Sequence, residues 1–155
     1  MEEAKSFFEM IVKILPGSSD AFEYESYRFC AAEHGGTHLD APRHFARGQH
    51  SAHDIELENL VGELFLVDVA DVASVDNDLL ITIDHLKRAE VYNNRSMNGS
   101  IVLLYTGFSH HWPKLNDYLG TNTTDTSLLH FPGLHPIAAK WIVDNRSRLG
   151  SILLP

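Results

Sequence analysis

Three histidines and one aspartate stand close together in the segment HGGTHLDAPRHF, residues 34–45. They are His34, His38, Asp40 and His44. Imidazole nitrogens and a carboxylate at this density are typical of a catalytic transition-metal site, which has three protein ligands and an open position. A packing role accounts poorly for them, because each side chain costs free energy to bury unless it is paired or coordinated. The segment therefore predicts a divalent metal site.

Glycine and proline residues shape the backbone of this segment. Residues 35–36 are both glycine, which argues against a continuous helix, since glycine costs about 1 kcal/mol relative to alanine inside a helix. We expect a tight loop there, followed by a short extended stretch. In that stretch His38 and Asp40 would point to the same side, because strand side chains alternate. Pro42 would stiffen the exit and direct His44 back to the site.

The same segment resembles the H-x-G-T-H-x-D-x-P-x-H signature of the cyclase family, the metal-dependent hydrolases that include bacterial-type kynurenine formamidase and isatin hydrolase. The resemblance implies that His34, His38 and Asp40 bind a divalent metal, Zn or Mn, and that His44 transfers protons. It covers roughly residues 22 to 148 and continues through VGELFLVDVAD (61–71), GSIVLLYTGFSHHWP (99–113) and LHFPGLHPIAAKWIV (129–143).

For function, the resemblance implies a metal-dependent amidohydrolase that acts on a small aryl amide. The leading candidate substrate is N-formylkynurenine, from tryptophan catabolism, so the expected activity is that of an arylformamidase. Hydroxide generated on the metal would attack the carbonyl carbon. His44 would give a proton to the leaving nitrogen, because imidazole titrates near neutral pH. An isatin hydrolase-like activity and a cyclase or dehydratase reaction use the same metal and stay open as alternatives.

The resemblance also predicts a shortened domain. Family members of this kind continue past the segment equivalent to Trp141–Arg148 into a G-x-D-T-x-S-x-D pattern and a further His and Glu, which do not follow here. Residues 1–21 diverge from the usual N-terminal strand. We therefore expect a single cyclase-like hydrolase domain over residues 1–155 that lacks its C-terminal part. The alternative function is a catalytically impaired form or pseudo-enzyme that acts through assembly with full-length subunits.

Two aromatic residues are candidates for contact with an aryl substrate. Phe45 follows the last histidine of the motif, and Trp112 stands in the loop after the segment SIVLLYTGF. Phe22 and Tyr24, just before the motif, are further candidates for an aromatic pocket. Aromatic residues in strands are more often part of the core, so this second pair has the weaker signal.

Composition limits the partners. The chain has 155 residues, of which 44% are hydrophobic, and a formal net charge of −9. A chain of this length buries about two-thirds of its unfolded surface, which is enough for a core. The negative charge argues against nucleic acid and anionic membranes as partners. The expected partner is the small-molecule aryl amide that the resemblance implies. The one cysteine, Cys30, stands in an apolar run, which indicates a buried structural thiol.

The localisation signals point in two directions. No apolar stretch reaches the roughly 18 residues needed to span a membrane, and two glutamates next to the first methionine do not fit a signal peptide. These features favour a cytoplasmic protein. The alternative is a secreted protein, because the sequence contains four N-glycosylation sequons. They begin at Asn94, Asn98, Asn122 and Asn145.

The elements that must position the motif alternate between strands and helices, which favours an α/β fold. The resemblance implies a mixed sheet with packed helices, a swivelling β/β/α-type domain, in a homo-oligomer. Near the N-terminus, apolar residues at helical spacing predict an amphipathic helix from Phe8 to Leu15. The other expected elements are strands over 22–32, 63–69 and 100–106, a helix over 82–92 with Thr82 as N-cap, and a helix over 136–144 with Pro136 in its first turn.

Overall fold

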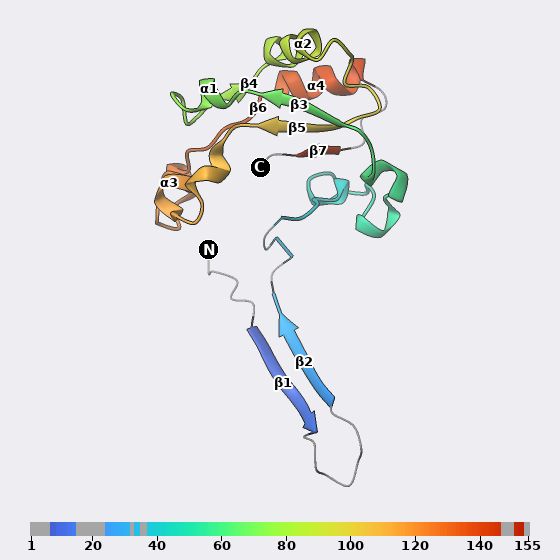
Figure 1. Cartoon of the computed structure of the whole chain (residues 1–155), viewed down its shortest axis with the longest axis vertical. Coiled ribbons are helices and arrows are strands. Elements are labelled where there is room, and N and C mark those ends of the chain that lie inside the picture. The colour runs from blue at the N-terminus through green and yellow to red at the C-terminus, as the bar shows by residue number, and fades with distance from the viewer. Residues whose placement is uncertain (1–6, 15–23, 32, 35–36, 147–150, 154–155) are drawn as a thin grey trace. The chain divides into compact units, whose positions relative to one another are not determined.

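The computed structural model describes residues 7–14, 24–31, 33–34, 37–146 and 151–153 (Figure 1). The chain folds as two compact units, Met1–Ala52 and His53–Pro155. The segment HGGTHLDAPRHF belongs to the first unit, and most of the helices belong to the second. The single domain expected over residues 1–155 stays a prediction.

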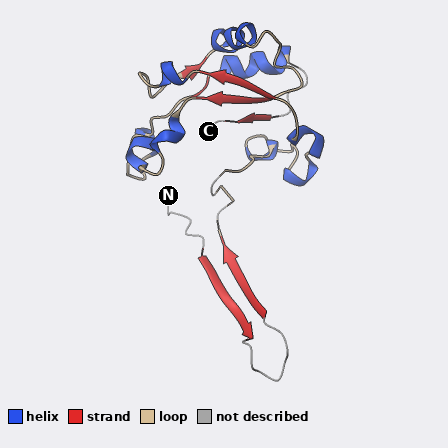
Figure 2. Ribbon diagram, in the orientation of Figure 1, coloured by secondary structure: helices blue, strands red, loops and turns tan. Residues whose placement is uncertain are grey.

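The first unit contains an antiparallel pair of strands, β1 (Phe7–Ile14) and β2 (Tyr24–Cys30), whose register shifts between Met10 and Val12 (Figure 2). After β2 the chain enters the motif and then forms the short 3-10 helix η1 (Pro42–His44). The 3-10 helix η2 (Ala52–Asp54) follows at the boundary between the two units. The strand expected to lead into the motif is therefore present.

Two predictions for this unit are wrong. The segment expected to form a helix from Phe8 onwards is the strand β1. Its phenylalanine and β-branched residues also suit a strand, and pairing with β2 supplies hydrogen bonds that local spacing cannot reveal. Cys30 is exposed rather than buried, because nearly all of β2 is exposed on both faces. Leu15 and Phe22 lie outside the described residues.

The second unit is built on parallel strands. Strands β3 (Leu64–Asp68), β5 (Ile101–Tyr105) and β7 (Ser151–Leu153) form one sheet with β5 in the centre. A smaller parallel pair joins β4 (Leu80–Ile81) to β6 (Gly133–Leu134). The strands expected over 63–69 and 100–106 are confirmed as β3 and β5, and so is the mixed α/β class.

Two ten-residue helices, α2 (Ile83–Tyr92) and α4 (Pro136–Asn145), lie over one face of the larger sheet (Figure 1). Both helices were expected, with Thr82 as the N-cap of α2 and Pro136 as the first residue of α4. No helix in the described part of the chain is long and apolar enough to cross a membrane. The remaining helices are short: η3 (Leu57–Leu60), α1 (Ala70–Ala73), η4 (Phe108–His111), α3 (Leu115–Leu119) and η5 (Thr126–Leu128).

The core of the second unit follows from the alternation of its strands. In β3, Phe65 and Val67 are fully buried, whereas their neighbours Leu64, Leu66 and Asp68 are exposed. The buried face packs against apolar residues of α2 and α4, and each large side chain removed from water contributes about 1.5–3 kcal/mol. The helix residues in this core are Leu86, Ala89, Ala138 and Ile142. Burial of one strand face and one stripe of each helix thus fixes this layer.

Candidate metal centre

Three side chains of the motif converge in the first unit. His34 lies in a turn after β2, and His38 and Asp40 lie in a stretch without regular secondary structure. Nδ1 of His34 is 2.9 Å from Nε2 of His38 and 3.1 Å from Oδ1 of Asp40. Nε2 of His38 is 3.3 Å from the same Oδ1. One atom from each side chain therefore forms a small triangle.

Hydrogen bonding alone does not explain this triangle. A neutral imidazole has one N–H group, and a carboxylate only accepts. If the N–H groups of both rings pointed to Asp40, two hydrogens would face each other across the 2.9 Å between the ring nitrogens. If only one ring nitrogen carried the hydrogen, two lone pairs would face each other across one edge of the triangle. Some contact in the triangle is therefore unfavourable without a cation.

A divalent cation fits the same three atoms. With metal–ligand bonds of about 2.1 Å, neighbouring ligand atoms lie about 3.0 Å apart at octahedral angles and about 3.4 Å apart at tetrahedral angles. The three observed separations, 2.9, 3.1 and 3.3 Å, lie close to this range. Two imidazoles and one carboxylate are also ligand types that Zn²⁺ and Mn²⁺ accept. The three residues thus form a group that could hold one metal ion.

His44 lies beside this triangle and is not one of its donors. Pro42 begins η1, and backbone bonds from His44 N to Ala41 O at 2.8 Å and from Arg43 N to His50 O at 2.9 Å hold the turn. The His44 ring contacts the His34 ring with centroids 4.4 Å apart. The turn therefore brings His44 back to the donor group, as the position of Pro42 suggested.

Solvent reaches the whole group. The side chains of His34, His38 and Asp40 are 46%, 32% and 40% exposed. Phe45 packs its edge against the His44 ring at a centroid distance of 4.4 Å and is itself 85% exposed. An exposed aromatic side chain next to His44 is thus available to a ligand that carries a ring.

The donor triangle contains no atom of Trp112, His50 or His53. Trp112 belongs to the second unit, where its ring meets that of Tyr118 edge to face at 5.8 Å. His50 is exposed, and His53 pairs with Asp54 at 3.3 Å.

Two polar pairs in the second unit were missed by sequence reasoning. His130 Nδ1 lies 2.9 Å from both carboxylate oxygens of Asp78, and Arg146 binds Glu90 with two nitrogens. Burial raises the pKa of Glu90, but hydrogen bonds from Arg146 and from backbone and side-chain groups nearby lower the pKa by more. The partners are 52 and 56 residues apart, so no local pattern marks either pair.

Comparisons with known proteins agree with the fold. A family model described as "Putative cyclase" matches residues 5–152. Isatin hydrolase of Roseibium aggregatum is 26% identical over 119 residues, which are 74% of this chain and 44% of that protein. Isatin hydrolase A from Labrenzia aggregata superposes with a TM-score of 0.75 at 24% identity, over 93% of this chain and 55% of that one. Isatin hydrolase A from Ralstonia solanacearum superposes with a TM-score of 0.74 at 26% identity, over 96% of this chain and 56% of that one. The chain thus spans about half the length of these relatives.

Proposed function

The chain belongs to the cyclase family, and from this premise we propose that it is a metal-dependent hydrolase of a small aryl amide. The observation that carries the proposal is the triangle of one donor atom each from His34, His38 and Asp40. The relatives support the reaction class, because those reported above are hydrolases by name.

We assign the metal ligands atom by atom. His34 would bind a divalent ion through Nδ1, His38 through Nε2 and Asp40 through Oδ1, and the ion is Zn or Mn by the chemistry of these donors. When bound, such an ion lowers the pKa of a water molecule towards about 7 and polarises a carbonyl group. The carboxylate of Asp40 offsets one of the two positive charges.

The residues beside the donors supply the remaining functions. His44 gives a proton to the amide nitrogen as its bond to the carbonyl carbon breaks, because its ring lies against a proposed ligand without being one. Phe45 offers an exposed ring to the aromatic part of the substrate, at the edge of His44. Trp112 stays a weaker candidate for the same contact.

The relatives favour an aryl lactam as the first substrate to assay. All three are isatin hydrolases by name. A further structure, of an isatin hydrolase bound to the product analogue thioisatinate, is 24% identical to this chain and has a TM-score of 0.67. N-formylkynurenine is the second substrate, because its hydrolysis breaks the same kind of bond between a carbonyl carbon and an aryl-bound nitrogen. In both cases water adds a hydroxyl group to the carbon and a proton to the nitrogen.

One experiment tests metal and activity together. The purified, dialysed chain is analysed for metal content and then assayed with isatin and with N-formylkynurenine after addition of Zn²⁺ or Mn²⁺. We expect one divalent ion per chain and hydrolysis of at least one substrate, with both lost in Asp40→Asn, which keeps the shape of the side chain. If elemental analysis finds no bound metal, the result would contradict the proposed metal centre. A metal-loaded chain that hydrolyses neither compound would contradict the aryl amide substrate.

A second candidate function is assembly with a longer member of the family. All three donors are well exposed, whereas hydrolytic sites work best when most water is excluded. In this case the metal-loaded chain would be inactive alone and would gain activity when mixed with a full-length relative.

For the oligomeric state and the localisation of the protein, a homo-oligomer in the cytoplasm stays our proposal.

A further inference from the structure

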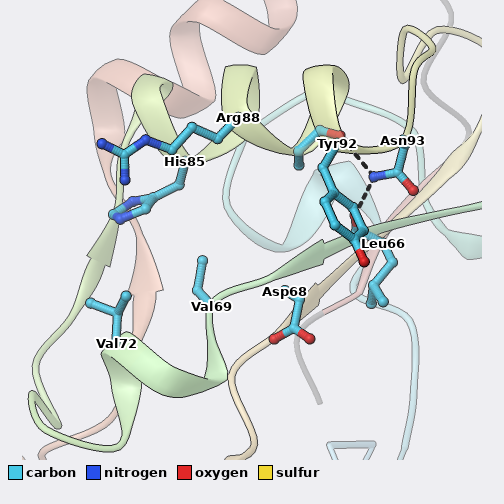
Figure 3. Close-up of a pocket in the computed structure, with 9 residues that line it drawn as sticks. Leu66, Asp68, Val69, Val72, His85, Arg88, Tyr92 and Asn93 are labelled. Atoms are coloured by element: carbon cyan, nitrogen blue, oxygen red, sulfur yellow. Dashed lines mark hydrogen bonds between the residues drawn. The ribbon is translucent and has the colours of Figure 1, made fainter.

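A cavity of about 460 Å³ opens between α2, the edge strand β3 and α1 (Figure 3). All its lining residues belong to the second unit, whereas the donor triangle of the metal centre belongs to the first. Its apolar wall consists of Leu66, Val69, Val72 and Ala89. Of these, Val69 and Ala89 are buried, whereas Leu66 and Val72 are 38% and 42% exposed. An apolar ligand group would therefore cover surface that now meets water.

The polar groups of this cavity are unevenly paired. Arg88 lines it, is exposed, and has no acidic partner within ion-pair distance among the described residues. Asn93, by contrast, donates its side-chain amide to Leu66 O at 3.1 Å and to Ala89 O at 2.8 Å. The amide is therefore already engaged, and the guanidinium of Arg88 is the cation that this cavity offers to a ligand.

His85 adds a second donor next to Arg88. The two residues are three positions apart on α2, so they lie on the same face of the helix, and both line the cavity. Nδ1 of His85 accepts a hydrogen bond from the Thr82 backbone N–H at 3.0 Å, as part of the N-terminal cap of α2. In the neutral ring the hydrogen must then be on Nε2. His85 can thus donate to a ligand through Nε2 only.

The acidic group of the cavity is already engaged in part. Oδ1 of Asp68 accepts a hydrogen bond from the Ala70 backbone N–H at 3.1 Å, just after β3. Figure 3 shows His85 and Arg88 over the α1 end of the cavity, near Val72, with Tyr92 and Asn93 at the other end. A negative group on a ligand would be repelled by Asp68 and attracted by Arg88. The charges therefore select one orientation.

We propose that this cavity binds a small organic carboxylate with an apolar body, with the carboxylate on Arg88 and His85 Nε2 and the body against Leu66, Val72 and Ala89. Guanidinium and carboxylate groups match in geometry and form charge-assisted hydrogen bonds. The apolar wall adds affinity for an aryl or alkyl group but not for acetate alone. An inorganic anion would bind to Arg88 but would leave the apolar wall of the cavity exposed to water.

The test is a titration of the full chain with phenylacetate, followed by NMR of the backbone and methyl groups. We expect saturable shifts at Val72 and Ala89, with a Kd on the order of 1 mM because the cavity is open. Arg88→Gln should weaken binding about tenfold, since a charge-assisted hydrogen bond is lost. Lys87→Gln is the matched control: it removes one positive charge from α2, but Lys87 lies over the Trp141 ring instead and should change Kd less than about twofold.

Neutral phenylacetamide separates charge recognition from apolar contact. It should bind about tenfold more weakly than phenylacetate. Equal binding of the two compounds, an unchanged Kd in Arg88→Gln, or no saturation with phenylacetate would each overturn the proposal. Shifts at Leu66 and Val72 that depend on protein concentration and block phenylacetate would also overturn it, in favour of a second copy of the chain on this surface.

Discussion

Arg146 holds Glu90 with two nitrogens and thereby joins the end of α4 to α2. Nε of Arg146 donates to Oε1 of Glu90 at 2.8 Å, and a second guanidinium nitrogen donates to Oε2. The guanidinium also lies over the Trp141 ring, 4.4 Å from its centroid. The two side chains are only 18% and 16% exposed. The pair is thus a partly buried, two-point link between helices that are far apart in the sequence.

We expect Arg146→Met to lower the free energy of unfolding by about 2 kcal/mol, because it leaves the Glu90 carboxylate partly buried without its cation. Urea denaturation at neutral pH measures this difference. Lys140→Met is the matched control. Lys140 forms an exposed ion pair with Asp144 within α4, and such pairs contribute about 0.3–0.5 kcal/mol. Equal losses in the two variants would show that the Glu90 link does not stabilise the fold.

The same pair predicts a dependence of stability on pH. The pKa of Glu90 in the folded chain lies below its ordinary value of 4.5: burial raises the pKa, and the hydrogen bonds from Arg146 and other groups lower it by more. Its contribution is therefore complete above the pKa of the unfolded chain and is lost as the pH falls through the folded pKa. The stability difference between the wild type and Glu90→Gln should shrink below about pH 4.5. A difference that grows on acidification would contradict the lowered pKa.

Mutation should distinguish the proposed metal ligands from His44, the proposed proton-transfer residue. His38→Ala and Asp40→Ala remove one donor atom each from the triangle and should abolish tight metal binding. His44→Ala should keep the metal and lower turnover at least about 100-fold, because it removes only the proton donor. Elemental analysis and steady-state kinetics distinguish the two outcomes. Loss of metal from the His44 variant would mean that His44 is a ligand.

Phe45→Ala should raise the KM for an aryl amide about tenfold and leave metal content unchanged, because the ring contacts His44 and is 85% exposed. Its unfolding free energy should change by less than about 0.5 kcal/mol, as at other exposed positions. Val91→Ala removes an apolar side chain that is 81% exposed in the second unit and serves as the control. Identical KM values in the two variants would show that Phe45 does not contact the substrate.

Strong local patterns in the sequence predict their elements correctly. Strands β3 and β5 stand out as apolar runs, and α2 and α4 each begin with a recognisable signal, Thr82 as N-cap or Pro136 in the first turn. The prediction of a helix for β1 is wrong, because its apolar residues fit both periods and only its partner β2 decides between them. The burial predicted for Cys30 is wrong for a related reason, since an apolar run does not show which of its faces is covered.

The sequence by itself determined the chemistry of the motif. His34, His38 and Asp40 lie within seven residues of sequence, and their donor atoms lie within 3.3 Å of each other. Only the tertiary structure decided which distant groups meet. The link from Glu90 to Arg146 joins residues 56 positions apart, and it exists because α2 and α4 pack on the same face of one sheet. The cation of Arg88 is available for the same reason: this packing sets α2 beside β3 and α1, and no acidic group among the described residues lies within ion-pair distance of the guanidinium.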